Sequence, residues 1–127
     1  MEWLISVLVC LLLVGLATHT AWSAVLVWRD PRRAQEEARQ WDRLGKHGAW
    51  AVTRGLVAMA ASFACLALMM ITYLAAEVFG QLRDSLVAVS GVFLCAMLAC
   101  WLVILMIALI NRPRCLIPPH LRAKRRP

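Results

Sequence analysis

The chain has 127 residues, of which 62% are hydrophobic and 17% are charged, and its formal net charge is +7. This composition lies outside the range of ordinary water-soluble domains, so a soluble globular protein is excluded. In a soluble protein the positive charge would indicate nucleic acid, but here the basic residues flank long apolar stretches, where they orient the chain and meet anionic lipid. We therefore expect an integral membrane protein, with anionic headgroups rather than nucleic acid as its ionic partner.

The first apolar stretch runs from Trp3 to Trp28 and contains no Asp, Glu, Lys or Arg. About 20 apolar residues, each rising ~1.5 Å along a helix, cross a hydrocarbon core of ~30 Å. Residues 3–28 are therefore predicted as the first transmembrane helix. The segment lacks the basic start and short apolar core of a cleaved signal peptide, so we expect a retained anchor.

His19, between two threonines, is the one histidine inside a predicted span. If Trp22 marks the inner boundary, His19 lies within a turn of the interface, where water reaches it. Since histidine titrates near neutral pH, His19 is a candidate pH-sensitive residue. The alternative is a structural histidine that is hydrogen-bonded to a neighbouring helix or to headgroup water.

Residues 29–54 form the predicted cytoplasmic loop and carry seven of the 14 basic residues. Asp30 and Pro31 are a helix-start signal, good helix formers continue to Leu44, and Gly45 can end the run. A short amphipathic helix is expected, either lying in the headgroup layer or forming a solvated linker. On the first interpretation, the residues that contact headgroups or a partner are Arg32, Arg33, Arg39, Trp41 and Arg43.

Two further apolar stretches predict transmembrane helices over residues 55–77 and 86–111, joined by an outer turn at 78–85. So short a connection forces an antiparallel hairpin, which we expect to turn at Gly80. Residues 112–127 form a basic tail rich in proline, expected to be a disordered or polyproline-like arm. Its candidate headgroup or partner contacts are Arg122, Lys124, Arg125 and Arg126.

The basic residues also predict the orientation of the chain. Thirteen of the 14 lie in residues 29–54 and 112–127, and the positive-inside rule places both segments in the cytoplasm. The amino terminus is then outside. The predicted fold is a single all-α membrane domain over residues 1–127, with three transmembrane helices and a cytoplasmic carboxy terminus.

Small residues mark the predicted packing surfaces, because close approach of helix backbones drives helix association in lipid. The third span carries Ala88, Gly91, Cys95 and Ala99 at helical spacing. The second span carries a matching set, Ala58, Ser62 and Cys65. These faces either pack the hairpin together or form a surface through which copies of the chain associate.

The sequence lacks the residue patterns of an enzyme. The spans contain no carboxylate pair, no serine with a histidine base at matching depth and no histidine pair for haem, and no phosphate-binding glycine loop occurs. The five cysteines are odd in number and form no C-x-x-C pair. We therefore expect no catalytic activity, no cofactor and no metal.

Two functions remain open. The first is an accessory, anchoring or immunity-type subunit that binds another membrane protein or a second copy of itself. The second rests on topology: three spans, an outside amino terminus and an inside basic tail resemble the three-span holins of tailed phages. That resemblance implies self-association and membrane permeabilisation, although the first loop here is longer and more charged. Because Arg outnumbers Lys twelve to two, we expect a high-GC genome, and hence a bacterial cytoplasmic membrane or, for a phage protein, the host membrane.

Overall fold

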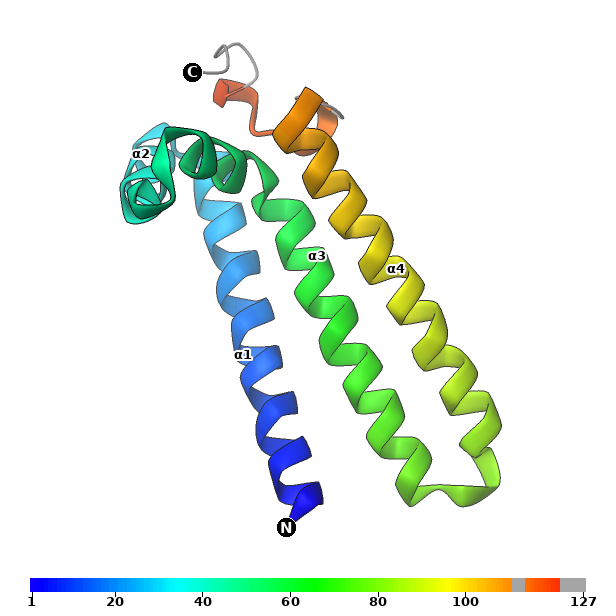
Figure 1. Ribbon diagram of the computed structural model, residues 1–127. Helices are drawn as coiled ribbons and strands as arrows, with labels where there is room; N and C mark the ends of the chain where they lie inside the picture. The colour runs from blue at the N-terminus through cyan, green and yellow to red at the C-terminus, as the bar shows by residue number, and fades with distance from the viewer. Residues whose placement is uncertain (111–113, 122–127) are drawn as a thin grey trace.

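A computed structural model describes residues 1–110 and 114–121 of the chain (Figure 1). Within these residues every regular element is an α-helix or a 3₁₀-helical turn, the turns being labelled η. In chain order the elements are α1 (Glu2–Arg29), α2 (Pro31–Gln40), η1 (Asp42–Leu44), α3 (Gly45–Val78), η2 (Gly80–Leu82), α4 (Arg83–Ile110), η3 (Arg114–Leu116) and η4 (Pro119–Leu121).

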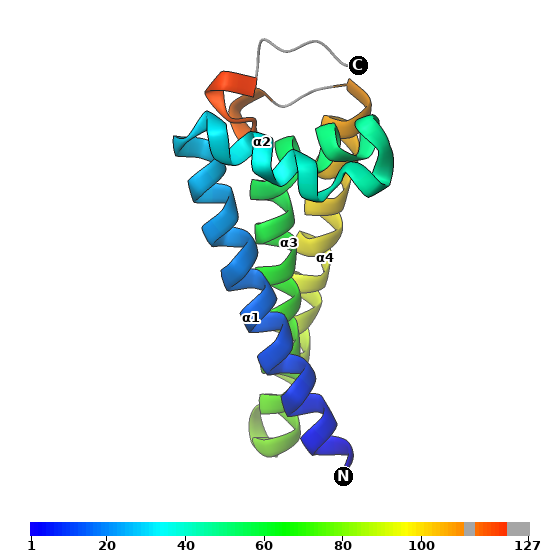
Figure 2. The same ribbon diagram turned by 90° about the vertical axis from the view of Figure 1, so that its left-hand side faces the viewer.

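Three helical stretches are long and apolar enough to cross a membrane, as the sequence predicts: Glu2–Arg29, Asp42–Val78 and Gly80–Ile110. The long helices stand side by side, with α3 between α1 and α4 (Figure 1). We call one end of this row the hairpin end; it holds the amino terminus and η2. The opposite, basic end holds α2, η1, the first ten residues of α3 and the turns η3 and η4, and α2 lies across it (Figure 2).

The helix boundaries agree with the predicted spans for α1 and α4 but not for α3. Helix α3 begins at Gly45, so residues 45–54 of the predicted loop extend the second span as a continuous helix. The predicted loop helix is correspondingly shorter, because α2 ends at Gln40 and Trp41 leaves helical geometry. At Gly45 the chain reverses with φ +78° and ψ 169°, a conformation that is essentially restricted to glycine.

The carboxy-terminal segment differs from the expected disordered arm. Residues 114–116 and 119–121 form 3₁₀ turns, and Ile117 is fully buried. Ile117 and Leu121 complete a core cluster at the basic end, which explains why this proline-rich segment is ordered against the helices. The cluster joins all four α-helices to the turns: Ala24, Val27, Ala34, Leu56, Ile107, Ile117 and Leu121.

Along the spans the inward-facing residues follow an alternating spacing of three and four. On α1 the buried or half-buried positions include Ser6, Cys10, Leu13, Ala17, Thr20, Ala24 and Val27. On α4 they include Leu86, Ser90, Phe93, Met97, Cys100, Ile104 and Ile107. This spacing is that of a left-handed helix seam with a crossing angle of about 20°. Both outer helices therefore pack on the rest of the chain through one narrow row of side chains. We call this row the α1 seam on α1 and the α4 seam on α4.

Candidate functional site

The small-residue stripe predicted on the third span faces away from α3. Ala88, Gly91, Cys95 and Ala99 are all exposed, whereas their neighbour Ser90 is buried. At 3.6 residues per turn, the stripe lies roughly opposite the α4 seam. A Cβ atom added to Gly91 would meet no other atom within 4 Å. The stripe is therefore outside the hairpin seam and leaves a closely approachable backbone on the outer surface of α4.

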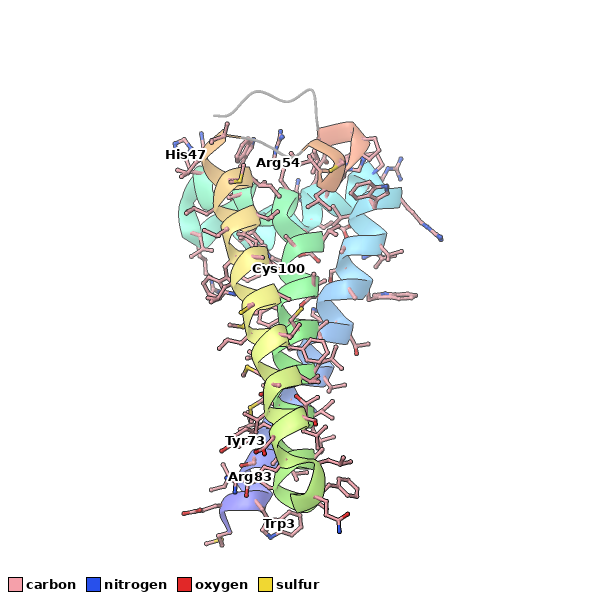
Figure 3. The ribbon with its side chains drawn as sticks, turned by 90° about the vertical axis from the view of Figure 1, so that its right-hand side faces the viewer. Trp3, His47, Arg54, Tyr73, Arg83 and Cys100 are labelled. Atoms are coloured by element: carbon pink, nitrogen blue, oxygen red, sulfur yellow. The ribbon has the colours of Figure 1, made fainter. Side chains whose placement is uncertain are left out.

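The small residues predicted on the second span lie inside the protein. Ala58 and Ser62 are buried and Cys65 is half-buried on α3. Cys65 lies beside Cys100, which is on the α4 seam in the half of the helix nearer the basic end (Figure 3). The structure thus brings the α3 set against the α4 seam, and it does not bring that set against the α4 stripe.

His19 lies on the outward side of α1 and is exposed, as is Thr18. Farther along α1, residues Ala24, Val25 and Trp28 lie alongside Val57 and Ala60 of α3. The apolar part of α1 therefore continues beyond Trp22 to Trp28, and His19 is ~14 Å of helix from Trp28.

The environment of His19 is a shallow groove on α1, lined by Gly15, Thr18, His19, Ala21, Trp22 and Val25. The Thr18 hydroxyl donates a hydrogen bond to the Val14 carbonyl at 2.8 Å, so its proton is already used within the helix. The imidazole of His19 and the indole N–H of the exposed Trp22 are the other polar side-chain groups among the residues that line this groove.

The predicted headgroup contacts on the loop lie on the surface of the basic end. Arg32, Arg33, Arg39 and Arg43 are exposed, and Trp41 is 36% exposed. The Asp30 carboxylate accepts a hydrogen bond from the backbone N–H of Arg32 at 2.9 Å, which caps α2 as predicted. Arg33 forms an ion pair with Glu36 at 3.1 Å. The tail candidates Arg122, Lys124, Arg125 and Arg126 lie outside the described residues.

The apolar side of α2 is turned into the protein. Ala34 is 3% exposed and Ala38 is half-buried. Both line a cavity of about 310 Å³ between α2, the start of α3 and η4, which we call the basic-end cavity. Its other lining residues are Pro31, Gln35, Asp42, Lys46, Ala49, Trp50, Thr53, Arg54, His120 and Leu121.

Arg54 is the largest fully buried side chain in the described part of the chain, at 1% exposure. Its guanidinium lies over the Trp50 ring, with Cζ 4.3 Å from the ring centroid. In Figure 3 Arg54 lies at the basic end, far from Trp3, Tyr73 and Arg83 at the hairpin end. A stacked and desolvated guanidinium of this kind contributes ~2 kcal/mol through its cation–π contact.

Within the part of the chain that the structure describes, Trp50 Nε1 and His120 Nε2 are buried atoms without a hydrogen-bond partner, and both residues line the cavity. The Thr53 hydroxyl donates to the Ala49 carbonyl at 2.7 Å and is satisfied within α3. The cavity thus combines an apolar wall of alanines with nitrogen atoms whose hydrogen-bonding capacity is unused.

Sequence reasoning missed this cavity. Trp50 and Arg54 fall within the predicted loop 29–54, and His120 falls within the predicted tail 112–127, so the sequence does not bring them together. One signal was present, since Trp50 and Arg54 are four apart and therefore neighbours on a helix. The contribution of His120 had no local signal, because it depends on the tail folding back onto α2 and α3.

No three His, Cys, Asp or Glu residues within 1–110 and 114–121 are grouped in a way that could hold a metal ion. Comparisons with protein-family models, with curated proteins and with solved structures found no match to this chain.

Proposed function

We propose that this chain is a small multi-pass membrane protein that works without catalysis, as an accessory, anchoring or immunity-type subunit that binds a further transmembrane helix. The observation that carries the proposal is the outward placement of features used in helix association. The small-residue stripe of α4 and the imidazole of His19 both face away from the helices of their own chain.

In lipid these placements favour a partner. Small residues permit backbones to approach closely, and they give little advantage to a helix that only faces acyl chains. A polar side chain within a span normally faces the interior of a bundle or pairs with a neighbouring helix. A helix that packs on the outer surface of the row satisfies the first requirement at α4, and one that packs on α1 satisfies the second at His19.

We further propose that the basic end faces the cytoplasm and the hairpin end faces outside. The basis is the positive-inside rule applied to residues 29–54 and 112–127, which carry 13 of the 14 basic residues. The positions of the amino terminus and of α2 are compatible with this orientation, since they lie at opposite ends of the row of helices (Figure 2).

The test is a pair of substitutions at adjacent residues of α4, of which Gly91 is exposed and Ser90 is buried. Gly91→Ile places a large side chain in open space on the outer stripe, so the chain should insert and fold normally while capture of its partner falls at least tenfold. Ser90→Ile places the same side chain in the buried seam and should disrupt the α3–α4 packing itself. Capture is measured with a photo-crosslinking residue at Ala99 in the full chain, followed by mass spectrometry of the crosslinked species.

The crosslinked species identifies the partner. A second polypeptide that is lost in Gly91→Ile supports the accessory function. Crosslinked oligomers that contain only copies of this chain, together with an abrupt collapse of membrane potential on expression, would contradict the accessory function and support the holin-like function. If Gly91→Ile leaves crosslinking unchanged, the α4 stripe is not part of the surface that binds the partner.

A further inference from the structure

The connection between α2 and α3 forms a shelf at the basic end. The chain runs outward along α2, reverses through η1 and Gly45, and returns along the first turns of α3, which contacts α2. The shelf lies across the end of the helix row, and α2 lies to one side of α1 (Figure 1, Figure 2). We call residues 39–46, where the chain reverses, the shelf tip.

The shelf is attached at the level where the apolar stretches end. Helix α2 begins three residues after Trp28, the last residue of the apolar stretch of α1, and the apolar stretch of α3 begins at Gly55. The end of α4 reaches the level of α2 in both views, and its last residue, Ile110, is 62% exposed (Figure 1, Figure 2). An exposed isoleucine is favourable in hydrocarbon and unfavourable in water. A lipid layer that covers the whole of α4 therefore extends to the shelf.

The shelf tip exposes apolar side chains, whereas α2 turns an alanine inward. Ala34 of α2 is buried, but Leu44 is 59% exposed and Trp41 is 36% exposed. Exposure of these apolar side chains to water is unfavourable. Tryptophan is enriched where a membrane meets water, because its ring is apolar and its N–H is polar. The part of the shelf suited to contact lipid is therefore its tip, and not the alanine side of α2.

Basic side chains surround these two apolar residues. Arg39, Arg43 and Lys46 are exposed, and Asp42 is the one acidic residue of the shelf tip. Within residues 1–110 and 114–121 these three basic residues form no ion pair, in contrast to Arg33 of α2. Their charge is available to an external anion, and their long aliphatic stems can lie along apolar surface while the charged ends reach phosphate.

From these features we propose that the shelf tip inserts among the anionic phospholipid headgroups of the adjacent leaflet. Leu44 and the Trp41 ring enter the boundary between headgroups and acyl chains, and the basic side chains bind the surrounding phosphates. An anionic lipid surface attracts this combination of apolar and basic residues through burial and charge together. This surface is separate from the α4 stripe and from His19, so the lipid contact is additional to the proposed function.

Fluorescence quenching tests the insertion in the full chain, reconstituted in nanodiscs of phosphatidylglycerol and phosphatidylcholine. A fluorescent amino acid replaces Leu44, and the same probe at Leu8, an exposed position on α1, is the lipid-facing reference. Lipids with brominated acyl chains should quench the probe at position 44 at least about half as strongly as the reference. Acrylamide in the aqueous phase should quench it less than it quenches the free amino acid.

A pair of arginine substitutions tests the ionic contact. Arg43→Gln and Arg33→Gln each remove one exposed charge from the basic end, but only Arg43 belongs to the shelf tip. Native mass spectrometry in detergent measures retained phosphatidylglycerol, with phosphatidylcholine as the neutral comparison. Arg43→Gln should reduce phosphatidylglycerol retention about fivefold and Arg33→Gln less than about twofold. Circular dichroism confirms folding, and Lys46→Gln repeats the test if Arg43→Gln does not fold.

The insertion requires both expected results. Quenching by acrylamide without quenching by brominated lipid shows a solvated shelf and overturns it. Protection of the probe from both quenchers shows a protein partner instead and also overturns it. Equal losses of phosphatidylglycerol in the two arginine variants, or no loss in either, overturn the ionic contact and with it the insertion. None of these positions lies on α4 or at His19, so failure here is distinguishable from failure of the proposed function.

Discussion

The two ends of the helix row differ in how they are packed. At the basic end, residues from α1, α2, α3, α4 and the carboxy-terminal turns share one buried cluster. At the hairpin end, every residue from 78 to 85 is exposed, including Phe79 and Leu82. Apolar side chains gain little by leaving lipid for a neighbouring helix, whereas segments that meet water gain by burial. Among the described residues the tertiary core is concentrated at the basic end, where the longer connecting segments fold back onto the helices, and the short hairpin turn has no such segment.

Arg54→Ala should have the largest effect on this contrast. Truncation leaves a void at a fully buried position and removes the stacking on Trp50, so the free energy of unfolding should fall by about 3 to 5 kcal/mol. Thermal unfolding in detergent, followed by circular dichroism, measures the change. The exposed Arg39 provides the control, and Arg39→Ala should change stability by less than ~0.5 kcal/mol. Equal effects of the two substitutions would contradict a packed basic end.

Ile117→Ala tests whether the carboxy-terminal turn belongs to the core. Ile117 is fully buried, and removing a buried isoleucine side chain costs about 2 to 4 kcal/mol. The matched change at the hairpin end is Leu82→Ala, where the side chain is 56% exposed and the expected loss is under ~0.5 kcal/mol. If chemical denaturation midpoints shift equally for both variants, the two ends are equally packed and the comparison fails.

Gly45→Ala and Gly80→Ala make the same change at the two ends. Gly45 has φ +78°, so alanine there is strained and should cost about 1 to 3 kcal/mol. Gly80 has no such φ, and a Cβ atom there meets nothing within 4 Å, so alanine should be neutral or slightly stabilising. The two melting temperatures measured side by side give the result. A neutral Gly45→Ala would show that the reversal into α3 does not require glycine.

The smallest expected effect concerns the exposed ion pair on α2. Arg33 and Glu36 are 3.1 Å apart, but both side chains are more than half exposed. A double-mutant cycle with Arg33→Gln and Glu36→Gln should give a coupling free energy of ~0 to 1 kcal/mol that decreases with added salt. A larger, salt-independent coupling would mean that the surface of α2 contributes to the core after all.

Hydropathy predicted the three long helices because each stretch is long and free of charge, and α1 and α4 match their predicted ranges within three residues. The start of α3 was not predictable in this way. Lys46 and Arg54 interrupt the apolar pattern, and the helix continues through them because Ala49, Thr53 and Arg54 are buried at the basic end. Tertiary packing, rather than local sequence, fixes that boundary.

The orientation of α4 was hidden for a different reason. In a span that is apolar all round, polarity does not distinguish the inner from the outer side. The small residues predicted the packing surface at the stripe around Gly91, which faces outward. The alternating spacing of Ser90, Phe93 and Met97 was the better indicator of the seam. The folding back of Ile117 had no local signal, since it depends on four helices being in place.

The cluster at the basic end also bears on the order of folding. Ala24 and Ile117 belong to the same cluster although they are separated by most of the chain. Contacts of such high sequence separation form late, because the intervening chain must first be arranged. The three spans can enter the bilayer one after another during synthesis, but the cluster closes after residue 117 has emerged. Until then Ala34 of α2 lacks the apolar neighbours that Ile117 and Leu121 supply.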